Sequence, residues 1–150
     1  MDLDSIDAVD LGRSLKGVGL NLLVRDVGQS VAFLRAVFGM KAFQPTADFA
    51  IIQTGDTILQ LHADHTYHAN PLPSLLPENG ARGGGVEIRL YGSDPDAAVR
   101  AADTVAEASI LQPVTNKPHG LREAYILDAD GYCWVPSRPL TDAEIKDMDP

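Results

Sequence analysis

The sequence is poor in cysteine, in basic residues and in long hydrophobic runs. Cys133 is the single cysteine among 150 residues, so no disulfide can form within the chain, which fits a reducing compartment. Lysine and arginine number 12 against 21 acidic residues, which gives a formal charge of −9. This charge repels the phosphate backbone of nucleic acids. No apolar stretch approaches the roughly 20 residues that a membrane-spanning helix needs.

The N-terminus is acidic, whereas a secretory signal peptide begins with basic residues. We therefore expect a cytoplasmic protein with no nucleic-acid partner and no membrane partner. Hydrophobic residues make up 45% of the chain, close to the share in ordinary globular domains. The length of 150 residues fits one domain that can bury a sizeable core.

One strand, one helix and three further strands are predicted in the first half. Apolar residues alternate from Val18 to Val24, which predicts a strand with one fully apolar face. Asp26 is placed to cap a helix over residues 28–38 that ends at Gly39. The three further strands are predicted at residues 41–44, 48–53 and 57–62.

The second half repeats this order. Apolar residues alternate again from Val86 to Leu90, an offset of 68 residues from Val18. Asp94 and Pro95 open a helix whose apolar face is expected to carry Val99, Ala102 and Val105 or Ala106. Strands are predicted at residues 109–112, 121–127 and 132–135. The matched order favours a duplicated unit over a chance likeness between two strand–helix pairs.

The predicted organisation has an N-terminal arm, a central domain and an acidic tail. The arm covers residues 1–16, the domain residues 17–140 and the tail residues 141–150. Within the domain, the first module covers residues 17–64, a linker loop residues 65–84 and the second module residues 85–140.

Polar residues fill the second face of the predicted strands. Glu87 and Arg89 alternate with the apolar residues of their strand, and Gln60 and His62 share a face by the same period of two. A sheet face of this kind either meets water or lines a cavity. Two such faces curved toward each other would form a cleft, and we expect a small-molecule ligand there.

Five short stretches carry a resemblance to a known family. They are Leu22–Asp26, Ser30–Leu34, Val37–Met40, Pro118–Glu123 and Asp128–Tyr132. In this order the stretches resemble the glyoxalase/bleomycin resistance protein/dioxygenase superfamily, also called the vicinal oxygen chelate proteins. The resemblance spans residues 18–138. It implies an α+β fold with two βαβββ modules that form paired incomplete barrels, and commonly a homodimer.

The resemblance also implies where a metal would bind. Enzymes of the superfamily hold a divalent metal with four residues, which here fall on Gly19, Gln60, Glu87 and Val135. Gly19 and Val135 have no donor atom, and the neutral amide of Gln60 is a weak ligand. We therefore expect no metal and no other cofactor. If a metal binds, Gln60, His62 and Glu87 would hold it.

The candidate site residues each have a plainer alternative. Glu87 is a candidate general base, or else a solvated carboxylate paired with Arg89. Arg89 can hold a carboxylate or phosphate of a ligand, or else form a surface ion pair. Tyr91 and Trp134 are candidate stacking surfaces for a planar ligand, although tryptophan more often packs in a core. The resemblance places His119 near the cleft.

Together these features predict a metal-free protein that binds a small planar or carboxylated compound. The ligand-binding candidates are Asn21, Gln60, His62, Arg89, Tyr91, His119 and Trp134. The main alternative is an enzyme: a lyase, isomerase or ring-cleaving dioxygenase with a rebuilt metal site, or a metal-free acid–base catalyst using Glu87. A third alternative is a structural or partner-binding module.

Overall fold

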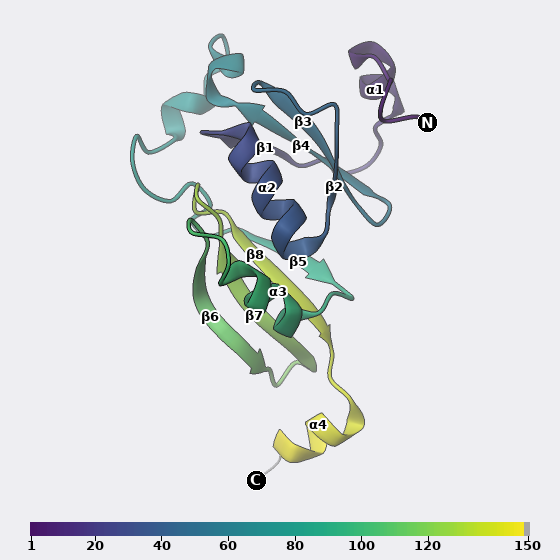
Figure 1. Cartoon of the computed structure of the whole chain (residues 1–150), viewed down its shortest axis with the longest axis vertical. Helices are drawn as coiled ribbons and strands as arrows, with labels where there is room; N and C mark the ends of the chain where they lie inside the picture. The colour runs from purple at the N-terminus through teal and green to yellow at the C-terminus, as the bar shows by residue number, and fades with distance from the viewer. Residues whose placement is uncertain (149–150) are drawn as a thin grey trace. The chain divides into compact units, whose positions relative to one another are not determined.

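The computed structural model describes residues 1–148, which form two compact units. The first unit holds Met1–Arg35 and Gly39–Leu76, and the second holds Ala36–Phe38 and the chain from Pro77 onward. Each unit contains one four-stranded mixed sheet (Figure 1). The units are described one at a time.

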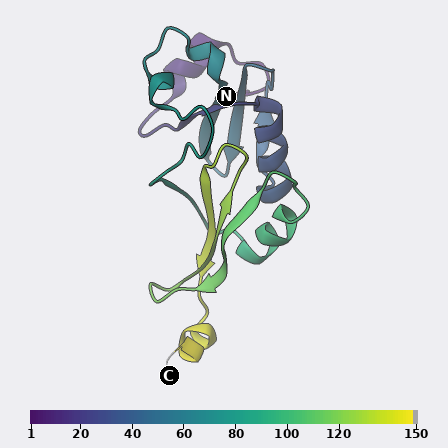
Figure 2. The same ribbon diagram turned by 90° about the vertical axis from the view of Figure 1, so that its left-hand side faces the viewer.

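In the first unit a sheet lies between two helical segments. Its strands run in the order β1 (Asn21–Val24), β4 (Thr57–Ala63), β3 (Phe49–Thr54) and β2 (Lys41–Phe43). β1 is parallel to β4, and the remaining pairs are antiparallel. Figure 2 shows α2 (Val27–Phe38) on one side of this sheet and α1 (Ala8–Ser14) on the other.

The ends of α2 follow directly from its sequence. The Asp26 side chain accepts a hydrogen bond of 2.9 Å from the Gln29 backbone N–H, which satisfies a donor that the first turn leaves free. Gly39 adopts φ 65° and donates to the Arg35 carbonyl, a left-handed cap that glycine takes without strain. The predicted N-cap and C-cap are confirmed.

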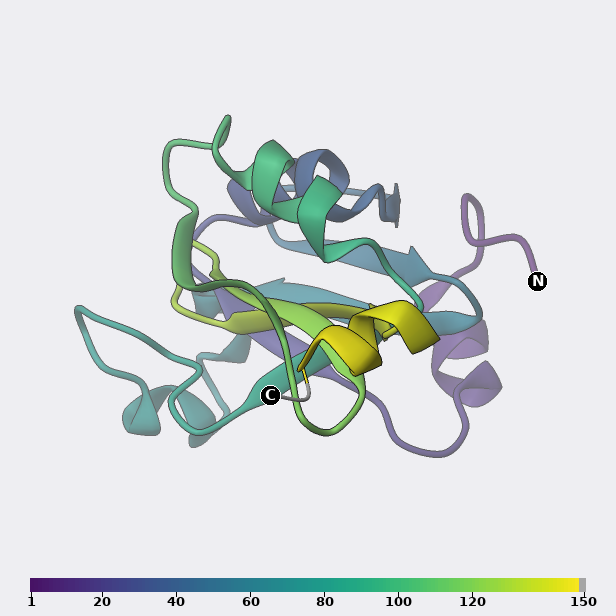
Figure 3. The same cartoon turned by 90° about the horizontal axis from the view of Figure 1, so that it is seen from below.

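The second unit repeats the same order of elements. Its strands run in the order β5 (Glu87–Tyr91), β8 (Cys133–Pro139), β7 (Leu121–Leu127) and β6 (Ser109–Asn116). Figure 3 shows α3 (Pro95–Ala102) against one face of this sheet. Asp96 of α3 accepts bonds of 2.7 and 2.8 Å from Arg122, so the face that carries Arg122 is the one under the helix. The predicted α+β fold of two βαβββ modules is confirmed.

Several predicted elements differ in the structure: β6 and β8 each extend four residues beyond their predicted ends. β1 begins at Asn21, and Val18 is fully exposed, because the ladder with β4 starts only where Asn21 meets Gln60. The linker contains two short 3₁₀ helices, η1 (Asp64–Tyr67) and η2 (Leu72–Leu75). The acidic tail is helical over α4 (Asp142–Met148), and residues 149–150 lie outside the described chain.

The apolar face of α3 also differs from the prediction. The helix ends at Ala102, so Val105 and Ala106 lie beyond it, and Val99 is only half-buried. Its buried residues are Pro95, Ala98 and Ala102. With Pro95 at the first helical position, the stripe facing the sheet starts one residue earlier than expected.

Candidate functional site

The open face of the first sheet, opposite α2, carries Gln60 and His62 side by side on β4. Strand register places Leu23 and Phe49 beside His62, and Ile51 beside Gln60. Leu23 and Ile51 are both buried. The face is therefore mixed: the polar residues Asn21, Gln53, Gln60 and His62 alternate across the strands with apolar ones.

The N-terminal arm, Met1–Leu15, covers this face. Leu3 and Leu11 from the arm bury themselves against Ile51 of β3. Four partly buried side chains pack around them: Ile6, Phe43, Phe49 and Ile58. The sheet thus receives apolar contacts on both sides, from α2 and from the arm.

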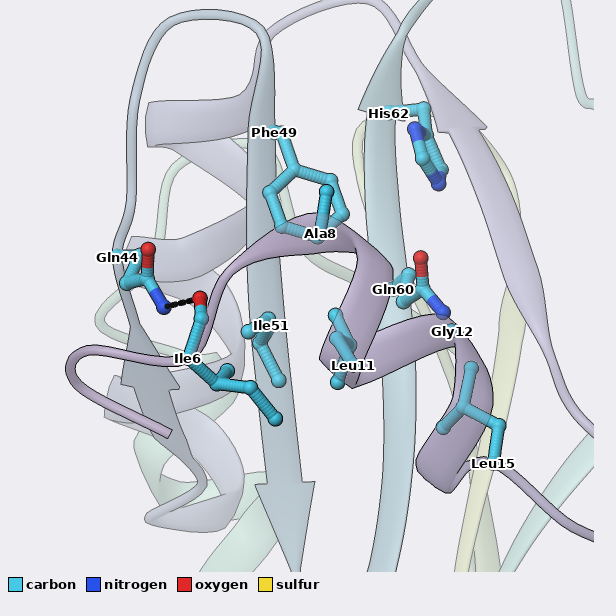
Figure 4. A pocket seen from close by; sticks show the side chains of 10 residues that line it. All are labelled: Ile6, Ala8, Leu11, Gly12, Leu15, Gln44, Phe49, Ile51, Gln60 and His62. Carbon is cyan, nitrogen blue, oxygen red and sulfur yellow. Dashed lines mark hydrogen bonds between the residues drawn. The ribbon is translucent and has the colours of Figure 1, made fainter. Parts of the chain in front are cut away.

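A pocket of about 380 Å³ remains between the arm and the sheet. Figure 4 shows its lining. The arm contributes Ile6, Ala8, Leu11, Gly12 and Leu15. The side facing the arm is made by Gln44, Phe49, Ile51, Gln60 and His62. Among residues 1–148, no aspartate, glutamate, lysine or arginine lines this pocket, so its described lining is apolar with amide and imidazole groups as polar contacts.

His62 is the most reactive group in this lining. Its Nε2 is buried and has no hydrogen-bond partner within the described part of the chain. The ring packs beside Phe49 and Tyr67, with centroids 5.1 and 5.2 Å away. Burial lowers the pKa of His62 below 6.5, so the imidazole is neutral at neutral pH. A neutral imidazole can donate or accept one hydrogen bond at Nε2, depending on its tautomer.

The open face of the second sheet carries a charged network centred on Arg89. Arg89 Nη1 donates to Glu87 at 3.1 Å, and Nη2 donates to Glu123. His119 Nε2 lies 3.3 Å from the same Glu123 carboxylate. The Glu123 side chain is only 1% exposed, whereas Glu87 and His119 reach solvent. The network therefore runs from a buried carboxylate to the surface.

Glu87 is stabilised in its charged form by these contacts. A hydrogen bond from Tyr125 and the contact with Arg89 lower the pKa of Glu87. A carboxylate with a lowered pKa is a weaker base, because proton uptake would break both interactions. The arrangement favours the ion-pair alternative for Glu87 over the general-base role.

A second pocket, of about 480 Å³, lies in this unit next to Glu87. Tyr125 and Cys133 line it together with the exposed side chains of Val86 and Leu111. Burial raises the pKa of the Cys133 thiol. The thiol therefore stays protonated at neutral pH and is no nucleophile.

Three other predicted residues lie in different surroundings. Tyr91 is exposed on the open face, with the Arg89 guanidinium carbon 5.6 Å from its ring centroid. Asn21 is exposed and is not among the residues that line the pocket under the arm. Trp134 is fully buried, and its indole N–H donates to Asp128 at 2.9 Å. Trp134 is a core residue, and we no longer assign it a ligand-binding role.

The sequence gives little sign of Glu123, Tyr125 and the arm as parts of these sites. Glu123 lies four residues after His119, a spacing with no meaning on its own outside a helix. The arm residues Leu3, Leu11 and Leu15 follow no period that extends over the whole arm. Only Leu11 in α1 and Leu15 at its C-cap, at a spacing of four, hint that the arm has an apolar face.

The positions that the resemblance assigns to metal ligands do not fit a divalent metal. Gly19 has no side chain, and Val135 is a buried hydrocarbon on β8. Glu87 is already bonded to Arg89 and Tyr125. Among residues 1–148, no group of three or more His, Cys, Asp or Glu side chains is arranged to hold a metal ion. A site rebuilt from Gln60, His62 and Glu87 draws on both units and stays a prediction.

Comparison with known families gives a clear match. The model of the Glyoxalase/Bleomycin resistance protein/Dioxygenase superfamily matches residues 18–135. The chain belongs to this superfamily. The match begins after the arm and spans both βαβββ modules, so the resemblance seen in the sequence is confirmed. No curated protein matches the chain.

Solved structures of other proteins share the fold. A glyoxalase/bleomycin resistance protein/dioxygenase family enzyme from Burkholderia phytofirmans PsJN superimposes with a TM-score of 0.67 at 18% identity, covering 81% of this chain and 96% of that one. TioX from Micromonospora sp. ML1 gives a TM-score of 0.58 at 28% identity and coverages of 83% and 100%. A lactoylglutathione lyase from Agrobacterium tumefaciens gives a TM-score of 0.59 at 21% identity, covering 83% of this chain and 95% of that one.

The helices of the chain are short. Within residues 1–148, none is both long and apolar enough to cross a lipid bilayer.

Proposed function

We propose that this superfamily member binds a small, uncharged and largely apolar compound in the pocket of its first unit, without a metal ion. The observation that carries the proposal is the pocket of about 380 Å³ under the arm, with Gln60 and His62 at its sheet side. Ligand sites in proteins are typically clefts of about 300–1,000 Å³ with apolar walls and a few polar groups that orient the ligand. The pocket has this composition.

The lining supports an uncharged ligand. A carboxylate or ammonium group placed here would lose its hydration and meet no opposite charge, which is costly. His62 does not supply that charge, because its lowered pKa keeps the ring neutral at neutral pH. Of the two ligand types expected from the sequence, the pocket therefore favours the planar compound over the carboxylated one.

Two polar side chains and one ring would orient such a ligand. Gln60 and His62 are alternate residues of β4, so both side chains lie on the face of the strand that lines the pocket (Figure 4). The Gln60 amide can both donate and accept, and His62 Nε2 is buried with no partner in the described chain. The Phe49 ring beside His62 offers a flat apolar surface.

Calorimetric titration with 1-naphthol and with 2-naphthoate, probes of similar size, tests this function. We expect 1-naphthol to bind and 2-naphthoate to bind about tenfold more weakly, since its carboxylate would be desolvated without a partner. Gln60→Met and His62→Phe each remove polar atoms at nearly constant size. Each should weaken 1-naphthol by about 1 kcal/mol, roughly fivefold in Kd, the usual worth of one hydrogen bond.

Gln53→Met is the matched control. Gln53 lies on β3 and on the same sheet face as Gln60, but it does not line the pocket. The variant should bind 1-naphthol as the wild type does. Preference for 2-naphthoate, or an equal loss in Gln53→Met and Gln60→Met, would contradict the proposed site.

The alternative is a lyase, isomerase or ring-cleaving dioxygenase that uses a metal held by Gln60, His62 and Glu87. Elemental analysis of protein purified without added metal separates it from the leading proposal. A content near one metal ion per chain, lost in Glu87→Ala, would favour the enzyme. We also expect a homodimer in the cytoplasm.

A further inference from the structure

One wall of the proposed pocket lies outside the superfamily domain. Five of its ten lining residues belong to the arm, which ends before residue 18, where the superfamily match begins. The floor comes from β3 and β4, which lie within the match. The shape of the pocket therefore depends on a segment that lies outside the matched superfamily domain.

Gly12 leaves open space in that wall. Ala8, Leu11 and Gly12 lie on one face of α1, Leu15 follows at its C-cap, and all four line the pocket. A Cβ built on Gly12 meets no atom within 4 Å. Glycine is unfavourable inside a helix, and the backbone at this position does not need it. A side chain at residue 12 would extend into the pocket and occupy part of its volume.

Gln44 connects the arm to the superfamily domain by hydrogen bonds. Its Nε2 donates to the Leu3 carbonyl at 2.8 Å and to the Ile6 carbonyl at 3.0 Å. Gln44 has φ 48°, the one positive φ of a non-glycine residue in the described chain. This conformation is uncommon for glutamine and carries some strain. The residue whose backbone is strained is thus the same residue whose side chain anchors the arm.

We propose that the arm is the specificity element of the pocket. The absent side chain at Gly12 sets the largest ligand that fits, and the Gln44 anchor sets how long the ligand stays. The inference rests on the proposed function, because it assumes that ligands bind under the arm. It assigns ligand choice to residues 1–15 and to their anchor.

A pair of probes of different size tests the role of Gly12. In the full chain, Gly12→Leu should weaken 1-naphthol roughly tenfold and the smaller phenol by less than about threefold, because the added side chain overfills the space only for the larger probe. Gly12→Ala, which strengthens the helix, should give an intermediate loss for 1-naphthol. Val9→Leu adds bulk to an exposed position of the same helix and should change neither affinity.

Stopped-flow release of 1-naphthol tests the anchor. Asparagine tolerates a positive φ well, but its shorter side chain cannot reach both arm carbonyls. Gln44→Asn should therefore keep the fold, checked by circular dichroism and the thermal midpoint, and release 1-naphthol about fivefold faster through a loosened wall. Gln53→Asn, outside the pocket, should release the probe at the wild-type rate.

The outcomes separate the two proposals. If the wild type binds neither phenol nor 1-naphthol, the proposed function fails, and the role of the arm fails with it. If the wild type binds both probes and Gly12→Leu weakens them equally or not at all, the pocket stands and the specificity role of the arm is overturned. An unchanged release rate in Gln44→Asn would likewise overturn the anchoring role.

Discussion

At the scale of single residues, Arg89 holds together the open face of the second sheet. It donates to Glu87 at the surface and to Glu123, whose carboxylate is 1% exposed. A buried carboxylate needs a charged or hydrogen-bonded partner, because its hydration is lost on folding. Arg89 and His119 both contact Oε2 of Glu123, His119 at 3.3 Å, whereas Oε1 is buried with no hydrogen-bond partner among the described residues.

Removing Arg89 should therefore destabilise the protein. We expect Arg89→Met to lower the free energy of unfolding by about 2–3 kcal/mol, below the range for fully buried pairs because His119 still contacts Glu123. Urea unfolding measures this change. Arg138→Met is the control: Arg138 pairs with Glu144 at 2.8 Å, but both side chains are accessible, so the midpoint should move little. Equal shifts in both variants would contradict the role of Arg89.

At the scale of elements, the two module helices start in the same way. Asp26 caps α2 and Asp94 caps α3, each by accepting a bond from the backbone N–H three residues later, at 2.9 and 3.1 Å. The repeat thus extends to the hydrogen bond that begins each helix. Each cap satisfies a donor that the first turn of a helix leaves free.

Loss of one such cap has a defined expected effect. Asp26→Ala should lower the free energy of unfolding by about 1 kcal/mol, whereas Asp26→Asn, which keeps the accepting oxygen, should stay close to wild type. Thermal or urea unfolding of the two variants measures the difference. If Asp26→Asn lost as much stability as Asp26→Ala, the charge and not the cap would be responsible.

Features set by neighbouring residues could be predicted from the sequence, and features set by distant ones could not. The bounds of α2 depend on Asp26 and Gly39, which act on adjacent backbone groups. The place of the arm depends on Leu11 meeting Ile51, forty residues later in the chain. No local pattern encodes such a contact. For the same reason the sequence could not show that the arm covers part of the face that carries Gln60.

The candidate site was predicted in part for the same physical reason. Gln60 and His62 share a strand face because side chains alternate along any strand. Glu123 could not be predicted as a buried site residue, because a glutamate in a strand is usually exposed to solvent. Its burial depends on the ion pair with Arg89, which lies 34 residues earlier in the chain. Trp134 lies on the sheet face that α3 covers, in register with Ile88. It is fully buried there, so it cannot contact a ligand.

At the scale of the whole molecule, exposed apolar side chains bear on the expected homodimer. Val86 and Leu111 of the second unit, which both line the pocket beside Glu87, are each more than half exposed. Large apolar side chains gathered on one surface usually mark an interaction site. These residues are candidates for contact with a second copy of the chain.

Light scattering during size-exclusion chromatography tests the homodimer. We expect a mass near twice the 16.1 kDa of one chain. Leu111→Lys should shift the protein toward the monomer, because it places a charge in the apolar contact. Leu75→Lys, at an exposed position of η2 in the first unit, should leave the mass unchanged. A monomer mass for the wild type at all concentrations would contradict the prediction.

The division of the pocket between arm and sheet has an evolutionary consequence. The sheet needs Ile51, Gln60 and His62 in fixed register, since a shift of one residue would turn these side chains to the other face. The arm carries no strand and its one helix is seven residues long, so its sequence can diverge without disturbing that register. A homologue could therefore acquire a new ligand by exchanging its first fifteen residues while inheriting the scaffold intact.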